Sequence, residues 1–78
     1  MPTVLVEDGF RFFFYSKEGT EPAHVHVEHQ ENRAKFWLRP VSLAWNAGFN
    51  ASTVTRLYAV IRENQTAFLE KWNEHFSR

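Results

Sequence analysis

The spacing of apolar residues changes once along this chain of 78 residues, close to Asn50. Before about Trp45, short apolar runs are separated by turn signals such as Asp8-Gly9, which is typical of antiparallel strands joined by hairpins. After Asn50, apolar and aromatic side chains recur at every third or fourth residue, the spacing of an amphipathic helix. Strands followed by a helix predict a single α+β domain over residues 1–78, with one face of the sheet beneath the helix.

The strands are expected to form an antiparallel sheet of four to five strands, connected as hairpins or a meander. They lie within residues 3–45, and their expected ranges are 3–6, 10–15, 23–29, a fourth from 32 or 33 to just before Pro40, and a short strand or extended arm at 41–45.

One long C-terminal helix is expected over about residues 52–76, because the apolar stripe runs past Asn64 without a jump. Asn50 or Ser52 can cap its start by accepting a hydrogen bond from a free backbone amide. Gln65 is the one polar member of the stripe. Three interpretations of Gln65 stay open: a kink, a buried hydrogen bond, or a contact with a partner.

Composition excludes several classes of protein. The chain has no cysteine, so it has neither a disulfide framework nor a thiolate metal site. Its formal net charge is zero, which argues against a strongly basic nucleic-acid-binding domain. The first residues lack a signal-peptide pattern, and we expect a cytoplasmic protein that does not contact a membrane. Eight Phe, three Trp and two Tyr are enough aromatic mass for some rings to serve an interface.

The predicted strands place a mixed set of side chains on the face away from the helix. Because strand residues alternate between faces, His24 and His26 should be neighbours there, beside the carboxylate of Glu28. His29 has the opposite parity and belongs to the other face or to a turn. The full set expected on this face is Arg11, Phe13, Tyr15, His24, His26, Glu28, Lys35, Trp37 and Arg39.

This face supports three interpretations. As a catalytic site for phosphodiester chemistry, histidines suit proton transfer because their pKa lies near ambient pH; the catalytic candidates are His24, His26 and Glu28, and the candidates for binding ligand or phosphate are Arg11, Tyr15, Lys35, Trp37 and Arg39. As a metal site, the H-x-H pair His24 and His26 would act with Glu28 or another carboxylate. No other cofactor is indicated. As an interface, a Trp among cations is typical of a surface that binds a protein partner or a second copy of the chain.

Three segments together resemble a known family. EPAHVHVEH (21–29), AKFWLRPVSLAWNAGF (34–49) and ENQTAFLEKWNEHF (63–76) are similar to short bacterial proteins grouped as domain of unknown function 4160, although Ala23 stands where a second proline is more usual. The resemblance implies that a small protein encoded nearby is the partner, and that the two form a toxin–antitoxin-type module. The expected function is therefore a toxin-like component that binds this cognate protein and acts on RNA, the ribosome or translation. The alternatives are a non-catalytic binding or regulatory module and a metal-binding protein.

Overall fold

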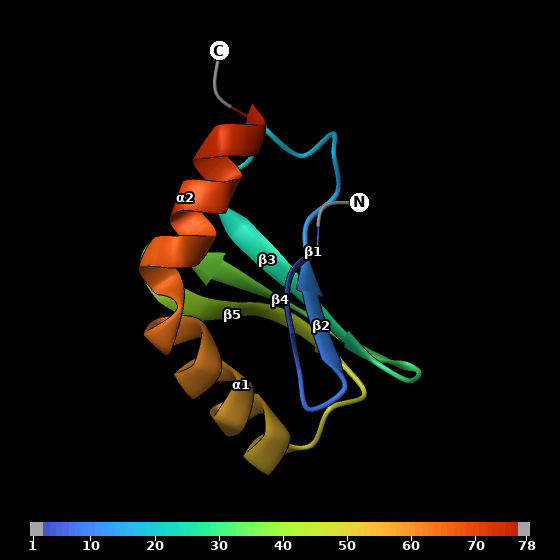
Figure 1. The fold of residues 1–78 in the computed structure, drawn as a ribbon. Helices are drawn as coiled ribbons and strands as arrows, with labels where there is room; N and C mark the ends of the chain where they lie inside the picture. The colour runs from blue at the N-terminus through green and yellow to red at the C-terminus, as the bar shows by residue number, and fades with distance from the viewer. Residues whose placement is uncertain (1–2, 77–78) are drawn as a thin grey trace.

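The computed structural model describes residues 3–76, which form one five-stranded antiparallel sheet and two helices (Figure 1). The strands follow one another in the sheet in chain order, so every connection is between neighbours. The elements are β1 (Thr3–Glu7), β2 (Phe10–Phe13), β3 (His24–His29), β4 (Asn32–Leu38), β5 (Val41–Ala47), α1 (Ala51–Glu63) and α2 (Gln65–Phe76). The expected α+β class and antiparallel meander are confirmed, and the segment after Pro40 is a full strand.

The hairpin between β1 and β2 follows the Asp-Gly signal. Glu7 pairs with Phe10 across a two-residue turn, and Asp8 and Gly9 both have positive φ angles, of 52° and 84°. Two consecutive left-handed residues match the right-handed twist of the flanking strands, and Asp-Gly is a favoured pair for this turn.

The expected single long helix is wrong, because the chain forms two helices separated at Asn64. Asn64 leaves helical geometry, and its side chain donates a hydrogen bond of 2.8 Å to the carbonyl of Val60. The next residue, Gln65, donates from Nε2 to the carbonyl of Leu38 at the end of β4, at 2.6 Å. Of the interpretations of Gln65, the interruption of the helix and the partly buried hydrogen bond are both observed. The start of α1 is capped by Asn50, which accepts a hydrogen bond of 2.8 Å from the amide of Thr53.

Replacing Gln65 with leucine tests how much this bond contributes. Gln65→Leu keeps the side chain's bulk but removes the donor to the Leu38 carbonyl, so the free energy of unfolding should fall by about 1 kcal/mol. Urea denaturation measures the change, and Thr66→Ala at the adjacent exposed position is the control. An unchanged midpoint for Gln65→Leu would mean that packing alone holds α2 at this point.

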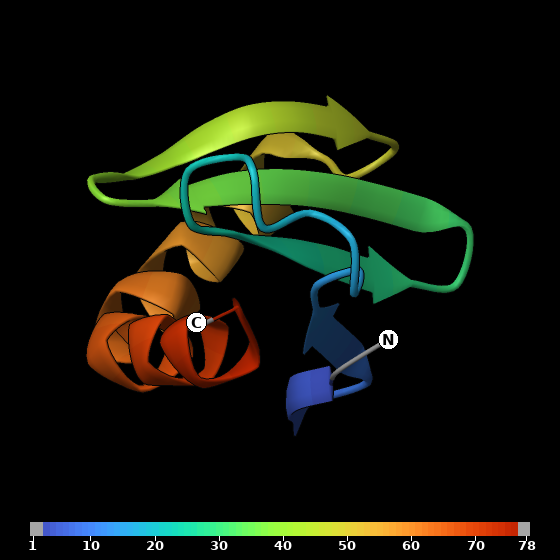
Figure 2. The same ribbon diagram turned by 90° about the horizontal axis from the view of Figure 1, so that it is seen from above.

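Both helices pack on one face of the sheet (Figure 2). Phe12 of β2 contacts Phe68 of α2, with ring centroids 5.8 Å apart, and Phe14 meets Trp72 at 5.3 Å. The same core includes the alternate residues of β3 and β4, which are Val25, Val27, Ala34, Phe36 and Leu38. The alternation of the strands therefore placed the apolar residues on the helix side, as expected. Within residues 3–76, no helix is both long and apolar enough to cross a membrane.

The opposite face, which we call the outer face, is organised in rows by the register of the strands. Arg11 of β2 lies opposite Glu28 of β3, which lies opposite Arg33 of β4. The next rows are Phe13, His26, Lys35 and Trp45, and then His24, Trp37 and Ser42. After Phe13 the chain leaves the sheet, and residues 14–23 form the connection to β3. This connecting loop brings further side chains to the histidines.

Candidate functional site: a histidine–carboxylate cluster

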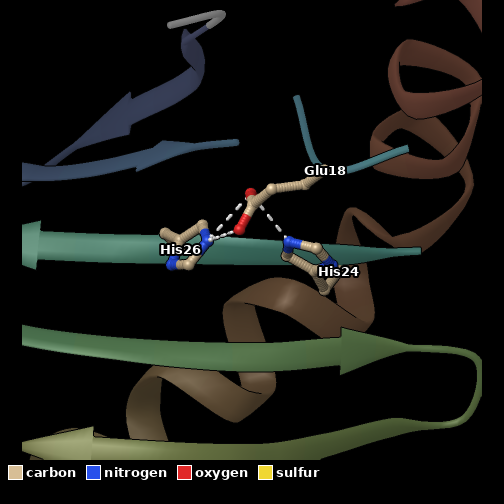
Figure 3. A group of neighbouring side chains, drawn as sticks. All are labelled: Glu18, His24 and His26. Carbon is tan, nitrogen blue, oxygen red and sulfur yellow. Dashed lines mark hydrogen bonds and ion pairs between the residues drawn. The ribbon is translucent and has the colours of Figure 1, made fainter. Parts of the chain in front are cut away.

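A carboxylate from the loop meets two histidines of β3 (Figure 3). Oε1 of Glu18 lies 2.9 Å from Nε2 of His24 and 3.1 Å from Nε2 of His26, and Oε2 is also 3.1 Å from the His26 nitrogen. The amide of Tyr15 donates to the same Oε1 at 3.1 Å, which helps to hold the side chain in place. Glu18, His24 and His26 are called the cluster below.

The cluster is much less exposed than a solvated sheet face would be. His24 has no exposed surface and His26 is 7% exposed, while the Glu18 side chain is 20% exposed. Burial of a polar side chain is unfavourable unless the side chain has a hydrogen-bond partner. Here each histidine has such a partner in Glu18. Solvent therefore reaches the cluster at Glu18 and His26, and it does not reach His24.

Aromatic rings enclose both histidines. The His24 ring lies between Trp37 of β4, at 5.8 Å, and Trp72 of α2, at 4.8 Å. The strand alternation alone predicted that His24 lies on the side away from the helices. The contact with Trp72 shows that it does not lie wholly on that side. His26 stacks on Phe13 at 5.5 Å and meets Tyr15 edge-on at 4.9 Å. These rings restrict the orientation of each imidazole.

The backbone carbonyl of Pro22 fixes one ring nitrogen of His24. Its oxygen lies 3.0 Å from Nδ1. A carbonyl oxygen can only accept, so Nδ1 carries the hydrogen. The other ring nitrogen, Nε2, faces the carboxylate of Glu18.

Burial and hydrogen bonding shift two pKa values of the cluster. Burial alone raises the pKa of the Glu18 carboxyl, but hydrogen bonds from His24, His26 and the Tyr15 amide outweigh it and hold that pKa below its usual value. Burial lowers the pKa of the His26 ring, and the hydrogen bond with Glu18 offsets only part of that effect. At neutral pH the cluster therefore combines an ionised carboxylate with a neutral His26.

Glu28, a catalytic candidate from the sequence, is directed away from the histidines. Its carboxylate accepts a hydrogen bond from Nε of Arg11 at 3.1 Å and lies 3.6 Å from a guanidinium nitrogen of Arg33. A second nitrogen of Arg11 also binds it, and the Arg11 guanidinium lies over the ring of Phe13. Glu28 and Arg11 thus form an ion pair next to the cluster, and Glu18 takes the place beside the histidines that was expected for Glu28.

Several of the expected ligand-binding residues lie around the cluster. Nζ of Lys35 contacts Glu21 at 2.6 Å and lies 4.6 Å from the ring centre of Trp37. The hydrogen bond from Lys35 lowers the pKa of the Glu21 carboxyl. Tyr15 is on the loop above His26. Arg39 follows β4 and is exposed at the turn before β5.

Three residues in or next to the cluster were not among the candidates from the sequence. Glu18 lies in a polar loop, where strand alternation says nothing about direction; its one signal was a carboxylate shortly before a histidine-rich strand. Trp72 belongs to α2 and is buried in the core, but it also contacts His24. Trp45 is 44% exposed, and its ring lies 6.2 Å from that of His26.

The fold and site define an α+β domain whose antiparallel meander carries a buried His–His–carboxylate cluster on one face and two helices on the other. A family model described as Domain of unknown function (DUF4160) matches residues 9–73. The chain belongs to this family. No curated protein and no solved structure matches it.

Proposed function

We propose that the protein is a cytoplasmic, toxin-like component of a bacterial two-protein module, that a small cognate protein binds it, and that it acts on RNA or the translation apparatus. The observation that carries this proposal is the position of the cluster, with proton-exchanging groups beneath a rim of aromatic and cationic side chains. The resemblance to the family supports the two-protein arrangement. The geometry supports the outer face as the working surface.

The rim has the chemistry needed to hold a single RNA strand. Exposed aromatic rings stack on bases without regard to sequence, and Tyr15 and Trp45 are 36% and 44% exposed. Lys35 can neutralise a phosphate when it exchanges its contact with Glu21 for one with the ligand. These three residues surround His26 in the fold.

His26 is the proposed general base. Cleavage of RNA by its own 2′-hydroxyl forms a bond from that oxygen to phosphorus and breaks the bond to the 5′-oxygen, giving a cyclic phosphate and a new hydroxyl. The attacking hydroxyl gives its proton to Nδ1 of His26, and the departing oxygen receives one from the same ring or from water. Glu18, which accepts the hydrogen on Nε2, stabilises the imidazolium that forms.

His24 is a positioning residue in this scheme. It has no exposed surface, so a substrate on the outer face does not reach it. Its Nε2 lies 2.9 Å from Glu18 and holds the carboxylate against His26. This differs from the expectation that His24 and His26 both exchange protons with substrate.

Inducible expression in the bacterial host tests the proposal. The intact chain should arrest growth, and His26→Ala should abolish the arrest while circular dichroism shows that the variant is folded. His29→Ala is the matched control: it removes an imidazole from the same strand, and that ring stacks on Phe10 at 4.6 Å, away from the cluster. Growth arrest that persists in folded His26→Ala would contradict the catalytic role of the cluster.

Co-purification tests the partner. The tagged chain, isolated from its host, should carry the product of the adjacent gene in a one-to-one complex, and Trp45→Ala should weaken that complex because an exposed Trp is a frequent anchor of interfaces. Recovery of RNA or ribosomes without this protein would contradict the two-protein arrangement. A dimer of the chain alone would support the homodimer instead.

A further inference from the structure

We propose that the cluster is a binding site for a divalent transition-metal ion, of which Zn²⁺ best suits its ligands: the carboxylate of Glu18, Nε2 of His24 and Nε2 of His26. One ligand atom from each residue lies within 4.8 Å of the other two, and the carboxylate of Glu18 lies between the ring nitrogens of the two histidines (Figure 3). This inference goes beyond the proposed function: a metal ion would replace the hydrogen that Nε2 of His26 donates to Glu18 in the nuclease scheme, so the scheme belongs to the ion-free chain.

The Pro22 carbonyl prepares His24 as a ligand. A metal-bound histidine commonly donates its other ring hydrogen to a carbonyl or carboxylate, which fixes the tautomer and the ring orientation. The 3.0 Å contact between Nδ1 of His24 and the Pro22 oxygen has this form. It leaves the Nε2 lone pair aimed into the cluster, where a metal ion would accept it.

The distances within the cluster allow one ion to contact all three groups. Oε1 of Glu18 lies 2.9 Å from Nε2 of His24. The same oxygen is 3.1 Å from Nε2 of His26. One cation between the three groups satisfies both nitrogens at once, whereas each proton satisfies a single contact.

Two of the three ligand separations are close to those around a bound ion. Zinc bonds of about 2.0–2.1 Å in tetrahedral geometry place ligand atoms about 3.3 Å apart, so the contacts of 2.9 and 3.1 Å need to open by only a few tenths of an ångström. The third separation, between the two Nε2 atoms, is within 4.8 Å. The histidines lie two residues apart on β3, whereas Glu18 lies on the connecting loop. The loop can therefore adjust the carboxylate without a change in the sheet.

The ligand set also limits which ion binds. Two imidazoles and one carboxylate suit Zn²⁺ and related transition metals, whereas Mg²⁺ and Ca²⁺ prefer oxygen ligands alone. Three protein ligands leave a fourth position open, as in zinc sites that bind water or substrate. The rings of Trp37 and Trp72 around His24 form an apolar shell that strengthens the attraction between the ion and its ligands.

Calorimetric titration of the full chain, free of any tag and treated with a chelator, tests the site. ZnCl₂ should bind with one ion per chain, and MgCl₂ at the same concentration should give no signal. Glu18→Gln and His26→Ala should each weaken Zn²⁺ binding by more than about 100-fold, since even loss of a residue that only supports a ligand typically costs 10–100-fold. His29→Ala should bind as tightly as the natural chain.

Thermal unfolding with and without Zn²⁺ gives a second measurement that does not depend on activity. The ion should raise the melting temperature of the natural chain and of His29→Ala, but not that of Glu18→Gln, because an ion stabilises only the fold that binds it. Glu18→Gln is the safer variant for folding, since its side chain is partly exposed on a loop. The site is disproved if the natural chain does not bind Zn²⁺, or if His29→Ala loses as much affinity as the cluster variants.

These results are separable from the test of function. A chain that binds Zn²⁺ through the cluster and causes no growth arrest would overturn the proposed function alone. A chain that arrests growth through His26 and does not bind the ion would overturn the metal site alone.

Discussion

Replacement of Trp72 by alanine is expected to lower the free energy of unfolding by about 3–5 kcal/mol. Trp72 is 6% exposed and packs against Phe14 at 5.3 Å, Phe76 at 4.3 Å and His24 at 4.8 Å. Its removal leaves a cavity between α2 and the sheet that these rings cannot fill. Domains of this size are stable by only about 4–12 kcal/mol, so the loss is a large part of the total.

Urea denaturation or a thermal melt of Trp72→Ala measures this loss. A melting temperature lowered by more than about 12 °C corresponds to the lower estimate for a domain of this length. Tyr58→Ala is the control, because Tyr58 is also an aromatic residue of the helices but is 36% exposed; its effect should stay within about 1 kcal/mol. Equal losses in the two variants would contradict the assignment of Trp72 to the core.

Substitution of Gly48 by alanine is the second change with a large expected effect, a loss of about 2–4 kcal/mol. Gly48 joins β5 to the segment before α1 and has a φ angle of +107°, which side-chain-bearing residues rarely adopt. An added Cβ would also lie 2.2 Å from Oδ1 of Asn32. Backbone strain and a steric clash therefore act together at this position.

The two causes can be separated in the same experiment. Asn32→Ala alone measures the loss of the asparagine side chain, and Gly48→Ala in that background retains the backbone strain but removes the clash. In the Asn32→Ala background, Gly48→Ala should then lower the free energy of unfolding by about 1–2 kcal/mol, which is less than the same change in the natural chain. If the cost of Gly48→Ala were the same with and without Asn32, the clash would contribute nothing.

Two of the three residues of the cluster could be predicted from the sequence. The alternation of β3 places His24 and His26 on the same face, because successive strand residues point to opposite sides, and the structure brings these two rings to 5.2 Å. Their carboxylate partner could not be predicted in this way. Glu28 shares the face, but the register places it between Arg11 and Arg33, which bind it, whereas Glu18 comes from a loop whose path depends on packing.

The break at Asn64 shows the same limit for the helices. The apolar stripe is continuous across it because α1 and α2 both cover the same side of the sheet (Figure 2). Periodicity reports which side of a segment is buried and does not show whether its axis bends. Two polar side chains bind backbone carbonyls at this break: Asn64 binds the carbonyl of Val60, and Gln65 reaches the carbonyl of Leu38 across the fold.

The sequence by itself determined most of the elements and their faces: an antiparallel sheet of four to five strands, a helical C-terminal segment, an apolar side beneath it and two neighbouring histidines on one strand. Those properties follow from the local spacing of residues and from turn chemistry such as Asp8-Gly9. Only the tertiary structure decided what the histidines contact, because Glu18, Trp37 and Trp72 come from different elements. Glu18 is close to His24 in the sequence but lies on a loop, whereas the two tryptophans meet His24 through packing between separate elements. The surroundings of the cluster therefore depend on contacts between elements, which no local pattern records.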